Sequence, residues 1–93
     1  MEAYDSKIYK LAKCISLSKY DGENPAEAAY TNDFGSMVKL ILEGADIDST
    51  HCFGYTSLSH LSCVPFDNHE GVDPNVAAVL MQWLIKKGCN VNL

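Results

Sequence analysis

Five residues of the kinds that bind zinc or act as nucleophiles fall in the second half of the chain: His51, Cys52, His60, Cys63 and His69. Imidazole and thiolate are ligands that Zn²⁺ prefers, and His60 and Cys63 have the short spacing of a ligand pair. No second pair accompanies them, and His51 and Cys52 are expected at the exposed end of a loop. Residues 67–73 also lack the acidic alternation and terminal Glu of a calcium-binding loop. The sequence therefore predicts no metal site and no cofactor.

Catalytic motifs are missing as well. The chain has no Gly-rich phosphate loop, no His-Glu-x-x-His and no Gly-x-Ser-x-Gly. Its 93 residues allow one domain, so no second domain is expected to enclose a substrate pocket. We therefore predict that the protein is not an enzyme.

The composition of the chain argues against nucleic acids and anionic membranes as partners. The net charge is −5, and all seven basic residues are lysines. Arginine is the residue that reads phosphates and guanine edges by paired hydrogen bonds, so its absence argues against nucleic-acid binding. An acidic chain is also not attracted to anionic membranes. The apolar content of 47% with 20% charged residues is ordinary for a folded domain.

The cysteines and the N-terminus indicate a compartment. The start of the chain is acidic and lacks the apolar core of a secretory signal. Cys14, Cys52, Cys63 and Cys89 show no Cys-x-x-Cys spacing and no disulfide framework, which favours free thiols in the cytoplasm or the nucleus. Cys52 is expected to react fastest, and Cys14 and Cys89 more slowly.

Apolar spacing and capping residues predict an all-α chain of about five helices. Tyr4, Ile8, Leu11 and Ile15 lie at steps of four, three and four, which places them on one face of a helix from residue 2 to about 18. Asn24-Pro25 and Asp73-Pro74 are typical helix starts. The remaining helices are expected at 25–31, at 36–43, from 56 onward and at 74–87.

Two segments repeat the same pattern. Residues 40–48, Leu-Ile-Leu-Glu-Gly-Ala-Asp-Ile-Asp, and residues 84–92, Leu-Ile-Lys-Lys-Gly-Cys-Asn-Val-Asn, each join the end of an amphipathic helix to a Gly stop and a short exit. Internal repetition of this kind is typical of stacked architectures.

These residues resemble the ankyrin repeat family. Gly44-Ala45-Asp46-Ile47-Asp48, followed by Phe53-Gly54-Tyr55-Thr56-Ser57-Leu58, is similar to the family's Gly-Ala-Asp-Val-Asn … Asp-Gly-x-Thr-Pro-Leu junction, and Asn24-Pro25 falls where the family has Thr-Pro. The resemblance covers residues 24–92. It implies a stack of helical hairpins with a β-hairpin loop projecting between Asp46 and Tyr55.

The resemblance divides the single domain 1–93 into a capping helix (1–20), one repeat (24–55) and a second repeat (56–93). Gly44 and Gly88 are 44 residues apart, whereas ankyrin units recur at about 33. We assign the surplus to a loop inserted at about 63–73. The chain ends where a further hairpin would begin, so it is either a fragment or an array that stops there.

Ankyrin repeats are binding scaffolds, so the resemblance implies a protein–protein interaction module, an adaptor or an inhibitor. Carried over by position, the partner-binding residues at the exposed end of the loop are Ser49, Thr50, His51, Cys52, Phe53 and Tyr55. Phe53 either contacts a partner or folds back on its own loop or the next repeat. The inserted loop adds Phe66 and His69, unless it is only a solvated insertion.

The alternative is a structural or capping segment of a larger array, or a self-associating unit, with no separate partner. The last helix supports this alternative, because apolar residues extend beyond the stripe of Val76, Leu80, Trp83 and Leu84. A terminal repeat normally has a polar outer face. We therefore expect Met81 and Ile85 to lie on an uncovered surface.

Overall fold

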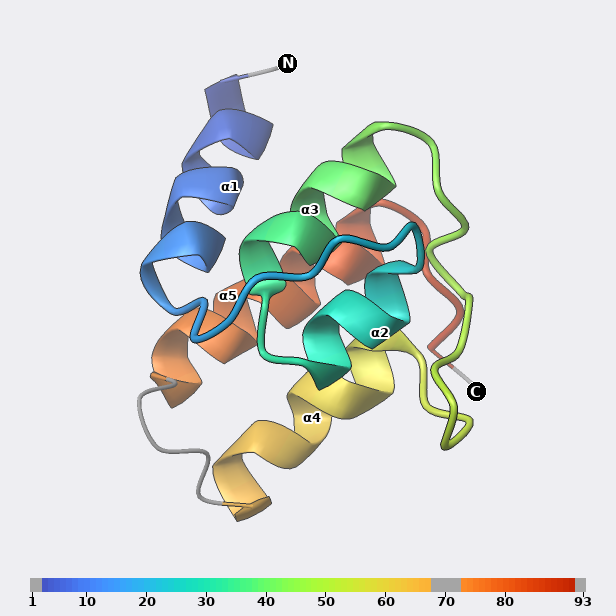
Figure 1. The fold of residues 1–93 in the computed structure, drawn as a ribbon. Coiled ribbons are helices and arrows are strands. Elements are labelled where there is room, and N and C mark those ends of the chain that lie inside the picture. Colours follow the sequence, from blue (N-terminus) through green and yellow to red (C-terminus); the bar gives the residue numbers. More distant parts are fainter. Residues whose placement is uncertain (1–2, 68–72, 92–93) are drawn as a thin grey trace.

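The computed structural model describes residues 3–67 and 73–91 and contains five helices within them (Figure 1). The helices are α1 (Ala3–Cys14), α2 (Pro25–Tyr30), α3 (Phe34–Leu42), α4 (Ser57–Asp67) and α5 (Pro74–Lys86). The prediction of an all-α chain is confirmed. Within the described ranges no helix is long and apolar enough to cross a membrane.

The predicted capping residues start the helices. The Asn24 side chain accepts hydrogen bonds from the backbone N–H groups of Ala26 and Glu27, and Pro25 occupies the first turn of α2. Asp73 accepts from the N–H of Asn75 at 2.8 Å at the start of α5, and Thr56 Oγ1 accepts from the N–H of Ser59 at the start of α4. Each contact satisfies a donor that the helix itself leaves without a partner.

The two repeated Gly segments end their helices in the same way. Gly44 and Gly88 have φ angles of 103° and 97°, which only glycine adopts at little cost. Gly44 N–H donates to Ile41 O and Ala45 N–H to Leu40 O. At the end of α5, the same pair of hydrogen bonds runs from Gly88 to Ile85 and from Cys89 to Leu84. Both ends are therefore Schellman caps, and the predicted equivalence of the two helix ends is confirmed.

The first helix is shorter than expected. It ends at Cys14, whereas the apolar spacing predicted a helix to about Ser18. The backbone N–H of Leu17 donates to Asn32 O at 2.8 Å, and that of Tyr20 donates to the Asp33 carboxylate at 2.8 Å. The segment that follows α1 is therefore bound to the turn between α2 and α3, and these tertiary hydrogen bonds replace the last helical turn.

The fourth helix is longer than expected. It continues to Asp67, so residues 63–67, which we assigned to an inserted loop, are helical. Pro65 lies inside this helix. A proline removes one backbone donor from a helix but does not by itself end it. The rest of the predicted insertion, residues 68–72, lies outside the described residues.

The loop after α3 is not the regular hairpin that the resemblance implied. Its only β-type contact in the described chain is a single antiparallel bridge between Thr50 and Thr56. The side chain of Asp46 instead accepts from the N–H of Asp48, and Ser49 N–H donates to Asp46 O. These local turns replace the strand pairing over the first half of the loop.

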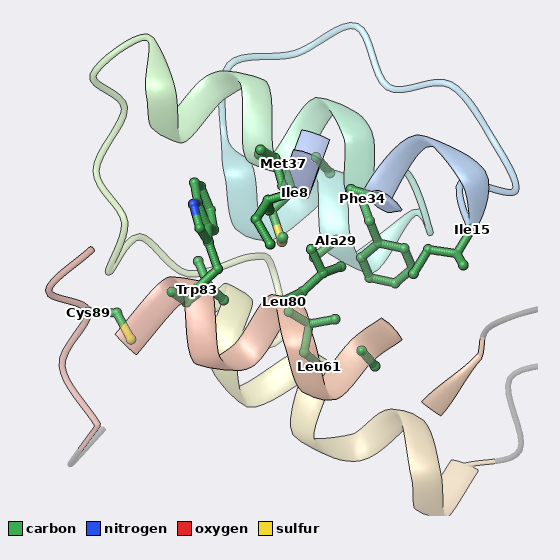
Figure 2. Packing of buried hydrophobic residues seen from close by; sticks show 14 residues of the cluster. Ile8, Ile15, Ala29, Phe34, Met37, Leu61, Leu80, Trp83 and Cys89 are labelled. Atoms are coloured by element: carbon green, nitrogen blue, oxygen red, sulfur yellow. The ribbon is translucent and has the colours of Figure 1, made fainter. Parts of the chain in front are cut away.

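The hydrophobic core joins all five helices (Figure 2). Ile8 of α1, Phe34 and Met37 of α3, Leu61 of α4 and Trp83 of α5 are all buried in it. The core also includes the small residues Ala28 and Ala29, which let α2 approach its neighbours closely.

The helices are arranged as two hairpins closed by α1. α2 packs on α3, α4 packs on α5, and the hairpins contact each other through α2 and α4. α1 contacts both α3 and α5. In a linear stack α1 and α5 would lie two layers apart, roughly 20 Å at ordinary helix spacing. The contact between α1 and α5 therefore makes the chain a closed cluster around one core.

This closure covers most of the last helix. Ala77, Leu80, Trp83 and Leu84 are buried, and Met81 is half-buried against the core. Our expectation that Met81 lies on an uncovered face is wrong, because Met81 packs against the core, and both α1 and α4 contact α5. Ile85 is 51% exposed, as expected.

Candidate functional site

The loop between α3 and α4 carries the sequence-predicted binding residues on a tightly bonded frame. His51 N–H donates to Tyr55 O at 3.0 Å, and Gly54 N–H donates back to His51 O at 2.9 Å. Gly54 has a φ of 86°, so a glycine suits this turn. With the Thr50–Thr56 bridge, these bonds fix the backbone that presents Cys52, Phe53 and Tyr55.

Side chains from distant parts of the chain anchor the base of this loop. Asn24 Nδ2 donates to Thr50 O at 2.9 Å, and Ser49 Oγ donates to Asn24 Oδ1 at 3.0 Å. Farther back in the loop, Asp48 accepts from the backbone N–H of Asn90 at 2.7 Å. The loop is therefore bonded to the start of α2 and to the segment after α5, beside which it runs in Figure 1.

His51 is at the centre of a group of rings. Its imidazole is only 5% exposed, and Nδ1 accepts the N–H of Phe53 at 3.0 Å. A neutral imidazole that accepts at Nδ1 carries its proton on Nε2. Nε2 is buried and has no hydrogen-bond partner among the described residues. The ring is held instead by its neighbours Tyr30, Tyr55 and Phe53, whose centroids lie 4.8, 5.5 and 5.9 Å away.

Three aromatic side chains around His51 are exposed. Phe53 is 66% exposed, Tyr55 51% and Tyr30 42%, and the Tyr30 and Phe53 rings are 5.4 Å apart. We call Tyr30, Phe53 and Tyr55, together with the buried His51, the aromatic surface. Centroid separations of this size are those of favourable ring pairs, so the rings support one another while presenting apolar area to solvent.

The predicted contact residues of the loop differ in exposure: some are exposed, some anchor the loop and one is buried. Phe53, Tyr55 and Cys52 are exposed, in agreement with their predicted place at the end of the loop. Thr50 is exposed and contributes its carbonyl to the anchor, and Ser49 is half-buried against Asn24. The expectation that His51 is an exposed contact residue is wrong, because the surrounding rings and the Phe53 N–H hold it inside the loop.

Two further predicted contact residues, Phe66 and His69, come from the predicted inserted loop. Phe66 belongs to α4, but its side chain is not among those described, and His69 lies outside the described residues. Sequence reasoning missed Tyr30, the last residue of α2. Its only local signal is a large ring beside the small residues Ala28 and Ala29.

Of the five candidate zinc ligands, the structure brings His51 and His60 close together. The His51 and His60 rings lie 5.9 Å apart, whereas Cys52 is exposed. No group of three or more His, Cys, Asp or Glu in the described residues is arranged to hold a metal ion.

All four thiols are free, and their exposure differs from our expectation at one position. Cys52 and Cys14 are exposed, Cys63 is half-buried and Cys89 is buried. Burial, together with the negative charge of Asp48, raises the pKa of the Cys89 thiol. Cys89 should thus react slowly, as predicted, whereas a slow reaction of Cys14 is not expected from its position at the end of α1.

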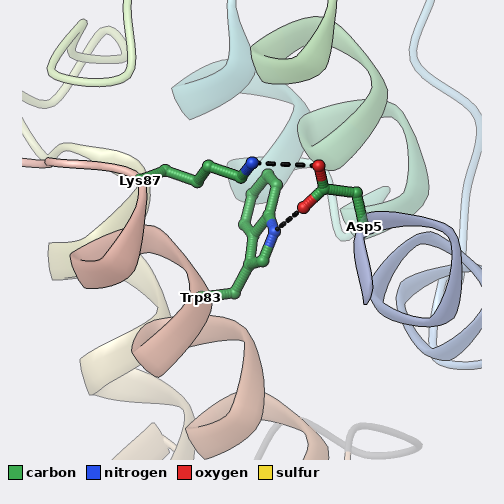
Figure 3. A network of polar contacts seen from close by, with 3 residues as sticks. All are labelled: Asp5, Trp83 and Lys87. Atoms are coloured by element: carbon green, nitrogen blue, oxygen red, sulfur yellow. Dashed lines mark hydrogen bonds and ion pairs between the residues drawn. The ribbon is translucent and has the colours of Figure 1, made fainter. Parts of the chain in front are cut away.

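A second cluster of polar and aromatic side chains joins α1 to α5 (Figure 3). Trp83 Nε1 donates to one oxygen of the Asp5 carboxylate at 2.9 Å, and the Lys87 ammonium donates to the other at 2.9 Å. We call the buried Asp5 and Trp83, together with the partly exposed Lys87, the buried network. The hydrogen bonds from Trp83 and then Lys87 lower the pKa of Asp5, against the opposing effect of burial.

A hollow of about 320 Å³ lies where α1 meets the start of α3, with Lys13, Lys19 and Asp33 on its walls. The side chains of Asp33 and Ser16 in this hollow already have partners. Asp33 accepts from the N–H and the hydroxyl of Ser36, and Ser16 Oγ accepts from the N–H of Gly35. Burial alone would raise the pKa of Asp33, but the hydrogen bonds from Ser36 and Tyr20 lower it. We therefore interpret Asp33 and Ser16 as capping residues at the start of α3 and assign no ligand to the hollow.

Comparison with known proteins gives no relative: no family model, no curated protein and no solved structure matches the chain.

Proposed function

We propose that the chain is a protein-interaction module that binds its partner through the aromatic surface. The observation that carries this proposal is the exposure of Phe53, Tyr55 and Tyr30 side by side around one buried imidazole. Tyrosine and other large rings are enriched among the residues that contribute most to protein–protein affinity. Their apolar area is removed from water only when a partner covers it.

The rigidity of the loop supports the same proposal. Binding costs free energy when a loop or side chain has to be ordered on contact. Here the backbone is bonded internally between His51 and Tyr55 and tied to Asn24 at its base. The rings are therefore held in position before a partner arrives, so little ordering is left to do.

The helix pairs add a weaker argument. Two helical hairpins end in the same Gly cap, and the binding loop connects one hairpin to the next. This order of elements is similar to ankyrin repeats, which serve as adaptors or inhibitors and not as catalysts. The contact of α1 with α5 is a departure from that family's open stack. With exposed thiols at Cys14 and Cys52, we assign the module to a reducing compartment, the cytoplasm or the nucleus.

Selection from a random peptide display library tests the proposal and does not require the partner to be identified first. Peptides are selected on the parent protein and then measured against Phe53→Ala and Tyr55→Ala. Leu17→Ala is the matched control, because Leu17 is 52% exposed but lies outside the aromatic surface. We expect the selected peptides to lose affinity for the two loop variants and to retain it for the control. Equal affinity for all variants would contradict the proposal.

One observation favours the alternative of a self-associating or array-forming segment. Ile85 and Val91, both exposed, lie at the C-terminal end of the described chain. If this end binds a second copy, sedimentation of the parent should show association and Ile85→Lys should abolish it. A parent that sediments as a monomer at high concentration excludes self-association and leaves the aromatic surface as the site.

A further inference from the structure

The charges of the chain are separated between two regions. Six of the seven lysines lie in residues 7–19 or at positions 86 and 87. Between residues 20 and 60 there are seven acidic residues and a single lysine, Lys39. The aromatic surface belongs to this acidic part of the chain, because all its residues lie between 30 and 55.

One segment that carries acidic residues is hydrogen-bonded to the base of the loop that bears the aromatic surface. Asn24 donates to Thr50 O and accepts from Ser49 Oγ, and these two hydrogen bonds join the segment 21–27 to the base of the loop. This segment includes Asp21 and Glu23, both exposed, and Glu27. Glu27 and Tyr30 are three residues apart on α2, so their side chains are neighbours on one face of the helix.

Two rings outside the aromatic surface, the exposed Tyr4 and the half-buried Tyr9, already have a lysine of the chain over them. The Lys86 ammonium lies 4.5 Å from the centre of the Tyr4 ring, and the Lys13 ammonium lies 4.8 Å from the centre of the Tyr9 ring. Within the described residues, no lysine is placed over Tyr30, Phe53 or Tyr55. The rings of the aromatic surface are therefore open to a cation from outside.

We propose that the aromatic surface binds a partner segment that carries lysine or arginine side chains. Exposed aromatic faces attract ammonium and guanidinium groups, and nearby carboxylates strengthen the attraction and speed the encounter. The aliphatic stems of the same side chains cover apolar ring area. This inference rests on the proposed function and specifies the chemistry of its partner.

Three fluorescent peptides of equal length, in which glycine alternates with arginine, glutamine or glutamate, test the inference. We expect the arginine peptide to bind most tightly and its affinity to fall as salt concentration rises. Phe53→Ala and Tyr55→Ala should each weaken its binding about two- to fivefold, the magnitude of one exposed cation–π contact.

Glu27→Gln and Glu43→Gln each remove one negative charge. Comparing them distinguishes attraction by a carboxylate near Tyr30 from attraction by the net charge of the chain. Glu27→Gln should weaken binding of the arginine peptide more than Glu43→Gln does, because Glu43 lies at the end of α3 away from the loop residues 51–55 (Figure 1). Equal effects of the two, with no effect of Phe53→Ala, would show non-specific attraction and overturn the inference.

The outcomes also separate this inference from the proposed function. If library-selected peptides depend on Phe53 but are neutral or acidic, and their binding is insensitive to salt, the cationic partner is wrong and the interaction surface remains. If no selected peptide depends on Phe53 or Tyr55, the interaction surface itself is wrong, and the cationic partner is overturned with it.

Discussion

The buried network and the aromatic surface are built from similar side chains but differ in what they leave available. In the buried network, a fully buried Trp83 ring donates to Asp5, and both carboxylate oxygens have a partner. In the aromatic surface, a buried imidazole supports three rings that remain 42–66% exposed. The first arrangement has its interactions satisfied within the chain, whereas the second retains apolar area that only another molecule can cover.

This difference separates a residue's contribution to stability from its contribution to binding. Substitutions in the buried network should destabilise the fold and affect binding only through unfolding. Substitutions of the exposed rings should weaken binding and leave the stability of the fold nearly unchanged.

The largest effect is expected for Trp83→Ala. It removes a fully buried ring from the core and the donor to Asp5. Replacement of a buried tryptophan by alanine typically costs about 3–5 kcal/mol, so most of the stability of a small domain is at risk. Chemical denaturation measures the loss, with Trp83→Phe as the variant that keeps much of the volume but not the N–H. A loss below about 1 kcal/mol would mean that α1 and α5 do not share this core.

Asp5→Asn should give the next largest loss. Hydrogen bonds to charged groups contribute about 1.5–3 kcal/mol, and the amide cannot accept from Trp83 and Lys87 at both of its polar atoms. Urea titration at neutral pH gives the difference from the parent. A variant as stable as the parent would show that the buried network contributes nothing net.

The same substitution predicts a pH dependence. The pKa of Asp5 is lowered in the folded state by the hydrogen bonds from Trp83 and Lys87, so its stabilising contribution is complete above the ordinary value of 3.8. It is lost as the pH falls below 3.8 through the lowered pKa, because the unfolded chain binds the proton first. The stability difference between parent and Asp5→Asn should therefore shrink in acid. A difference that is constant with pH would contradict this assignment.

An intermediate effect is expected at Asn24, which caps α2 and is hydrogen-bonded to the loop between α3 and α4. Asn24→Ala loses the cap of α2 and both loop contacts, and loss of such a cap costs about 1 kcal/mol. Asn24→Asp keeps the capping oxygen but cannot donate to Thr50 O. We expect the Asp variant to retain the stability of α2 while the loop becomes more mobile, measured by amide hydrogen exchange at His51 and Gly54. Unchanged exchange there would show that Asn24 does not hold the loop.

The smallest effect is expected at Ile85. Ile85→Lys changes an exposed side chain, so its effect on stability should stay within about 0.5 kcal/mol. Met81→Lys lies one turn earlier but is packed against the core, so it should destabilise more. Equal effects of the two substitutions in thermal unfolding would show that Met81 does not pack against the core.

Local sequence signals predicted the features that depend on neighbouring residues. The caps at Asn24 and Asp73 and the helix stops at Gly44 and Gly88 each follow from a few adjacent positions. The resemblance that drew on these signals implied a loop between Asp46 and Tyr55, but not its irregular backbone.

Contacts between distant segments were not predictable in this way. Asp5 and Trp83 are 78 positions apart, and nothing local indicates that an acidic residue in the first helix meets an indole in the last. The same holds for the bond from Leu17 to Asn32, which ends α1 early. Tyr30 joins the aromatic surface only because α2 packs beside the loop, and His51 is buried only because these rings surround it.

The central claim is that the aromatic surface binds a partner and is not needed for folding. The most direct test is the dissociation constant of a library-selected peptide for Phe53→Ala compared with the parent, under conditions where circular dichroism shows both to be folded. We predict that the variant binds at least about tenfold more weakly, as expected for an exposed ring that is central to an interface. Affinity within about twofold of the parent, below the smallest loss expected for one ring contact, would contradict the account.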